Sequence, residues 1–151
     1  MTDFSVAFKK GQEAALAADV SRKEIDTVFN EVRKQLLAAT DGSIEIIRQE
    51  RIKKNDPYVI KLFSPAEKYW SIDAINPKSD PSELITKELA MWEQAQSGYP
   101  CKISLGGTDS ICHDKESLEN ALNWLLSDVR TAEKLRILIS SQHQEQNKTS
   151  E

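Results

Sequence analysis

Apolar residues in the N-terminal part of the chain recur every three or four positions, which is the period of one face of an α-helix. This spacing predicts a helix over residues 3–18. After a short break at Asp19-Val20, a capping box formed by Ser21 and Glu24 predicts a new helix that runs to about Ala39. Its apolar stripe consists of Ile25, Val28, Phe29, Val32 and Leu36. The pattern fits either an antiparallel helix pair or one long helix with a bend.

After Gly42 the period of the apolar residues falls to about 2, which is typical of β-strands. It predicts strands over residues 43–52, 58–63 and 69–75. Turn-forming residues separate the three segments, with Asn55-Asp56-Pro57 in the first connection and Pro65 in the second. Because the connections are short, we expect an antiparallel meander.

A further helix start is predicted at Asp80, which would cap a helix that has Pro81 at its first position and Glu83 at its third. The predicted helix ends at Gly98. Its buried stripe would consist of Ile85, Leu89 and Trp92.

The C-terminal third begins with a predicted β-hairpin, formed by residues 100–105 and 108–113 across Gly106-Gly107. Asp114 then caps a helix, and residues 129–140 form a shorter one. The apolar face of the first of these helices consists of Leu118, Ala121, Leu122 and Leu125, with Trp124 near its edge.

The predicted element order is therefore α-α-β-β-β-α-β-β-α-α. Strands and helices are segregated along the chain, which favours an α+β fold with one antiparallel sheet of about five strands covered by helices. We expect a single domain over residues 1–141, because no linker interrupts it. The tail at 142–151 lacks apolar residues and is predicted to be disordered.

The composition and charge of the chain argue against several classes of function. The 151 residues carry a net charge of −4 and are 39% hydrophobic, and no apolar run is long enough to span a membrane. The N-terminus lacks a basic region followed by an apolar stretch, so we expect no secretory signal and a cytoplasmic location. The acidic balance argues against general nucleic-acid coating, which depends on phosphate neutralisation.

The densest group of reactive side chains lies between Cys101 and Asp114. If Gly106-Gly107 is a two-residue turn, Cys101 lies directly opposite Cys112, while His113 projects to the other face. The thiol pair is then a pair of small core residues, a redox pair or two soft metal ligands. Zinc needs four ligands, so we expect no metal site and no cofactor.

Basic and aromatic residues alternate around the predicted first hairpin, a composition that can bind nucleic acid. The alternative is a solvated sheet edge whose cations prevent aggregation. The basic candidates are Arg48, Arg51, Lys53, Lys54, Lys61 and Lys68.

No catalytic motif is evident. His113 stands beside Asp114, but a helix cap explains that carboxylate. Three strand carboxylates, Glu45, Glu50 and Asp73, are the acidic residues to inspect in a structure. Partly exposed aromatic residues often mark protein interfaces, and the candidates here are Tyr69, Trp70 and Trp124.

The sequence therefore favours a non-enzymatic protein-interaction module that binds another protein or itself as a homodimer. Adaptors, inhibitors, chaperones and immunity-type proteins, often accessory proteins of bacteria or phages, have this composition. Two alternatives stay open: a nucleic-acid-binding regulator that uses the basic hairpin, and a small enzyme or ligand-binding domain centred on residues 101–114.

Overall fold

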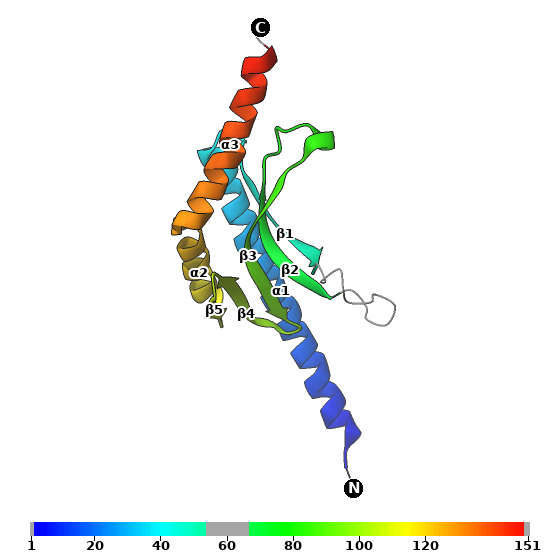
Figure 1. Cartoon of the computed structure of the whole chain (residues 1–151). Coiled ribbons are helices and arrows are strands. Elements are labelled where there is room, and N and C mark those ends of the chain that lie inside the picture. The colour runs from blue at the N-terminus through cyan, green and yellow to red at the C-terminus, as the bar shows by residue number, and fades with distance from the viewer. Residues whose placement is uncertain (1, 54–66, 150–151) are drawn as a thin grey trace, which may run out of the picture.

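A computed structural model describes residues 2–53 and 67–149 and shows an α+β fold, as predicted (Figure 1). Five strands form one antiparallel sheet in the order β1-β2-β3-β4-β5. The helices are α1 (Phe4–Ala39), α2 (Lys115–Ser127) and α3 (Val129–Thr149). The strands are β1 (Glu45–Ile52), β2 (Lys68–Ile75), β3 (Thr86–Ala95), β4 (Gly98–Leu105) and β5 (Thr108–Cys112).

One hydrophobic cluster joins the three helices to one face of the sheet. Ile72, Trp92 and Ile103 lie on that face, because cross-strand partners and every second residue of a strand share a side. They pack with residues of the helices that include Ile25, Phe29, Leu118, Leu122 and Leu138. Within the described ranges, no helix is long and apolar enough to cross a membrane.

The N-terminal region is one continuous helix, α1, so the single long helix is the correct one of the two arrangements that the pattern left open, and the separate start predicted at Ser21 is wrong. Asp3 caps this helix by accepting a hydrogen bond of 3.0 Å from the Ser5 backbone N–H. Ser21 lies in the interior of α1. A Ser-x-x-Glu sequence fits there without steric conflict, and the backbone hydrogen bonds of the helix continue through it. The buried residues of α1 begin only at Ile25, and its N-terminal end extends well beyond the sheet (Figure 1).

The predicted helix over residues 80–98 is also wrong, because most of this segment is the central strand β3. Asp80 does cap a turn, but only the short 3-10 segment Pro81–Glu83 follows it. From Thr86 to Trp92 the strand pairs with β2, and from Met91 to Ala95 it pairs with β4. This pairing outweighs the high helix propensity of a segment such as Lys-Glu-Leu-Ala-Met.

The remaining elements lie close to their predicted places. The β4–β5 turn has positive φ at Gly106 (58°) and Gly107 (80°), and Asp114 caps α2 through the Ser117 backbone N–H at 2.8 Å. Helix α3 extends past residue 140 to Thr149, into the segment predicted to be disordered. The predicted strand over residues 58–63 lies outside the described residues.

Candidate protein-interaction groove

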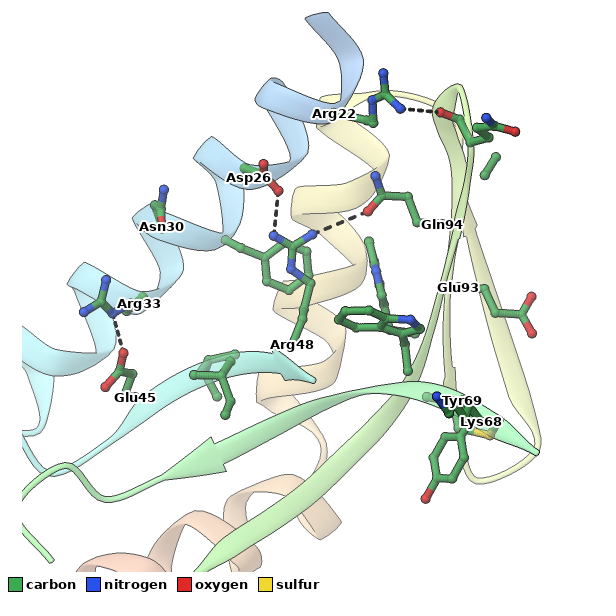
Figure 2. A pocket seen from close by; sticks show the side chains of 18 residues that line it. Arg22, Asp26, Asn30, Arg33, Glu45, Arg48, Lys68, Tyr69, Glu93 and Gln94 are labelled. Carbon is green, nitrogen blue, oxygen red and sulfur yellow. Dashed lines mark hydrogen bonds and ion pairs between the residues drawn. The ribbon is translucent and has the colours of Figure 1, made fainter. Parts of the chain in front are cut away.

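A groove of about 960 Å³ lies between α1 and the part of the sheet that consists of β1, β2 and β3 (Figure 2). The helix crosses the sheet so that its residues 22–33 form one wall, and the strands form the floor. Aromatic side chains line the floor and charged side chains line the rim. The groove therefore combines an apolar base with polar edges.

Arg48 lies at the centre of the groove. Its guanidinium stacks 4.2 Å from the centroid of the Phe29 ring and lies 5.7 Å from that of Trp92. An arginine nitrogen donates to the Asp26 carboxylate at 2.7 Å, and a weaker contact of 3.5 Å reaches the Gln94 side-chain oxygen (Figure 2). Cation–π stacking and the ion pair together hold this cation over the aromatic floor.

Further charged contacts form the rim of the groove. Arg33 pairs with Glu45 at 2.5 Å, and Arg22 donates to the backbone oxygen of Gln96 at 3.3 Å (Figure 2). Glu45 is thus a rim residue whose charge is matched. The lining includes four basic residues and three acidic ones, so the groove is close to neutral although the chain is acidic.

Trp70 supplies the exposed aromatic surface of the groove. Its strand register pairs it with Trp92, which is only 3% exposed and contacts Phe29 edge-on at 5.0 Å between ring centroids. Trp70 itself is 48% exposed. An exposed indole beside a buried aromatic pair is a typical anchor point for a partner.

Tyr69 is among the residues that line the groove, but its side chain points away from it (Figure 2), and Trp124 lies elsewhere. Tyr69 is the strand neighbour of Trp70, so it points to the opposite face of the sheet, where its hydroxyl donates to Glu88 at 3.2 Å. Burial first, and then the Glu88 charge, raises the pKa of Tyr69. Trp124 packs against the hydrophobic cluster from α2.

The opposite face of the sheet carries a buried acidic network around Asp73, whose side chain is fully buried. Arg51 donates to this carboxylate from Nη2 at 2.7 Å and from Nε at 3.1 Å. The Ser71 hydroxyl donates at 2.7 Å, and the Gln49 amide donates as well. The hydrogen bond to Asp73 raises the pKa of Arg51 further. The oxygens of the Asp73 carboxylate accept all of these hydrogen bonds, so Asp73 has a structural role.

The predicted basic cluster does not form one surface among the described residues. Arg48 and Arg51 are separated by the sheet, and each contacts a carboxylate. Lys53 pairs with Glu67 at 3.3 Å, and Lys68 pairs with Glu50 at 3.8 Å. Lys54 and Lys61 lie outside the described residues. The nucleic-acid hypothesis therefore rests on cations that are divided between two faces and paired.

The thiol pair has the predicted register, with Cys101 directly opposite Cys112. Both are free thiols, and they are 1% and 0% exposed in the hydrophobic cluster. A hydrogen bond between the two thiols, together with burial, raises the pKa of Cys101. The same hydrogen bond lowers the pKa of Cys112, but both thiols are enclosed, and the geometry is that of core residues.

His113 is exposed beside this pair, and no metal-binding group of three or more His, Cys, Asp or Glu side chains occurs in the described part of the chain.

Comparison with known protein families, curated proteins and solved structures gave no significant match.

The sequence contains one sign of the groove. Ile44, Ile46 and Arg48 alternate from the residue before β1 into the strand, which places an arginine on its apolar face. A cation at such a position needs an aromatic or acidic partner. Those partners, Asp26 and Trp92, come from α1 and from a segment predicted to be helical, so the alternation alone did not identify them.

Proposed function

We propose that this protein is a non-enzymatic protein-interaction module and that the groove between α1 and β1–β3 receives a segment of a partner polypeptide. The observation that carries this proposal is the exposed Trp70, which borders the Arg48, Phe29 and Trp92 stack. Tryptophan and arginine dominate the energetics of protein interfaces, most of all beside a preformed concave surface.

The packing of the groove supports recognition without large rearrangement. Phe29 and Trp92 are buried in the free protein, and Arg48 is already fixed by its contacts, so binding would order few additional side chains. An apolar side chain of the partner would cover Trp70. Polar groups beside it would meet the mixed charges of the rim.

The two alternative functions have less structural support. The candidate cations for nucleic-acid binding are divided between two faces, and the thiols of the 101–114 hairpin are enclosed in the core.

Panning the immobilised protein against a random peptide display library tests the proposal. We expect enriched peptides whose binding, measured by calorimetry with synthetic peptide, weakens roughly 30-fold or more in Trp70→Ala, the loss typical of a hot-spot tryptophan. Ile111→Ala is a matched control, because Ile111 is 56% exposed on the other face of the sheet. Peptides that bind Trp70→Ala as tightly as the wild type, or no enrichment at all, would exclude the groove as the binding site.

A further inference from the structure

The outer edge of β1 is a surface that can pair with a further strand. β1 lies at one end of the sheet, and β2 is its strand neighbour in the described part of the chain (Figure 1). The register with β2 is unbroken over the eight residues from Glu45 to Ile52, so no bulge interrupts the strand. The outer edge of such a strand has a row of backbone N–H and C=O groups that can bond to another chain.

The two ends of the sheet differ in how far they are protected against strand pairing. At the other end, β5 has only five residues and packs against α2. β1 is longer and contains no lysine and no proline, which are common means of blocking an edge. Its charged side chains instead exclude any strand that places a like charge opposite them. The edge of β1 therefore accepts a strand whose charges match its own.

The backbone groups that point outward follow from the register. The Lys53 N–H donates to the Glu67 carbonyl at 2.7 Å, and these two residues continue the register of β1 and β2. Because hydrogen-bonded positions alternate in an antiparallel pair, the odd-numbered residues of β1 bond to β2. The outward-facing N–H and C=O groups belong to Ile46, Arg48, Glu50 and Ile52.

A second copy of β1 matches this edge when the two strands run antiparallel about a two-fold axis through Gln49. Each outward-facing residue then lies opposite another one, which allows about eight hydrogen bonds between the strands. Arg48 of each copy lies opposite Glu50 of the other, so the symmetry gives two ion pairs. Ile52, which is 64% exposed in one copy, lies opposite Ile46 on the same face.

Neighbouring registers are less complementary. An axis through Arg48 would place this arginine opposite itself, and an axis through Glu50 would place two carboxylates opposite each other. An axis through Ile47 would place Arg48 opposite Ile46, without a charge to match. The axis through Gln49 is the one among these four that pairs both charges.

The two charged side chains are available to a second copy. Glu50 is 44% exposed, and its ion pair with Lys68 is long, at 3.8 Å. The Arg48 guanidinium donates from Nη2 to Asp26 and from Nη1 to Gln94. A guanidinium has five N–H donors, so Arg48 can keep these contacts and bind a second carboxylate.

We infer that two copies of this chain pair through the outer edges of β1 in this antiparallel register, so that their sheets join into one continuous sheet. The pairing uses the backbone edge of β1, whereas the groove lies over its face. The inference therefore does not depend on the proposed function.

Analytical ultracentrifugation of the full chain over a range of concentrations tests the association. We expect a reversible dimer that becomes a monomer in Glu50→Pro, because proline removes an outward N–H but is tolerated on the free side of an edge strand. Glu50→Lys should weaken association roughly tenfold or more, since it places a like charge opposite Arg48 in both pairs. Glu93→Lys makes the same charge change on a 65% exposed side chain of the interior strand β3 and should have no effect. Circular dichroism checks that each variant is folded.

Amide hydrogen exchange tests which edge is paired. The N–H groups of Arg48 and Glu50 should exchange quickly at low concentration and slowly in the dimer. Those of Ile47 and Gln49 bond to β2 and should be protected at both concentrations.

Cysteine cross-linking tests the register. Gln49→Cys should form a disulfide with its own copy under mild oxidation, because the axis places the two cysteines directly opposite each other. Glu50→Cys should not, since it lies opposite Arg48. The native thiols, Cys101 and Cys112, are 1% and 0% exposed and leave the readout clear.

A monomer at every concentration would overturn the inference, even if its edge captured a strand of another protein. A dimer that persists unchanged in both Glu50→Pro and Glu50→Lys would overturn it as well. Self-cross-linking of Glu50→Cys in place of Gln49→Cys would exclude the register.

Discussion

The buried pair of Asp73 and Arg51 makes a quantitative prediction about stability. Removing the carboxylate in Asp73→Ala deprives Arg51, Ser71 and Gln49 of their shared acceptor. Breaking a buried ion pair typically costs 3–5 kcal/mol. Because the Arg51 side chain is 28% exposed and can regain some hydration, we expect a loss near the lower end, about 3 kcal/mol.

Urea unfolding followed by tryptophan fluorescence measures this loss, which corresponds to a midpoint lower by about 1.5 M at a slope of roughly 2 kcal/mol/M. Glu67→Ala is the control, because Lys53 and Glu67 are 65% and 70% exposed and the variant should change stability by less than about 0.5 kcal/mol. A double-mutant cycle with Arg51→Ala should give a coupling above about 1 kcal/mol. Equal effects of Asp73→Ala and Glu67→Ala, or a coupling near zero, would refute the reasoning.

Three further variants test single contacts. Gly98→Ala should lower the free energy of unfolding by about 2 kcal/mol or more, because the φ angle of Gly98 is +95° and the added Cβ would lie 2.7 Å from the Cβ of Ser21. An unchanged urea midpoint would contradict this. Thr131→Val should raise stability by about 1 kcal/mol, because the buried Thr131 hydroxyl has no hydrogen-bond partner in the described part of the chain; a loss of stability would show that the hydroxyl is bonded. Burial, and then the hydrogen bond to Glu24, raises the pKa of Tyr99, so its contribution to stability is complete below about pH 10 and is lost at higher pH. Stability should therefore fall less steeply above pH 10 in Tyr99→Phe than in the wild type, and identical pH profiles would contradict the assignment.

The sequence by itself determined the elements whose signals are local. The Asp114 cap and the apolar face of α2 lie within a few residues of each other, and the Gly106-Gly107 turn fixes the register that places Cys101 opposite Cys112. The same local signals established an antiparallel α+β fold. They misplaced the segment over 80–98, where helix propensity and strand pairing conflict and the partners that decide between them, β2 and β4, come from other parts of the chain.

Only the tertiary structure decided what the side chains do. Alternation along a strand places neighbours on opposite faces, but the position of α1 decides which face is covered, so the Trp70 side chain lies on the face of the groove whereas the Tyr69 side chain points away from it. Arg48 and Arg51 lie three positions apart in β1 and therefore on opposite faces, but only the fold shows that one stacks in the groove and the other holds Asp73, because their partners lie more than twenty positions away. The structure likewise decided between a helix pair and one long helix at the N-terminus in favour of the long helix, since a capping pattern is compatible with a helix interior.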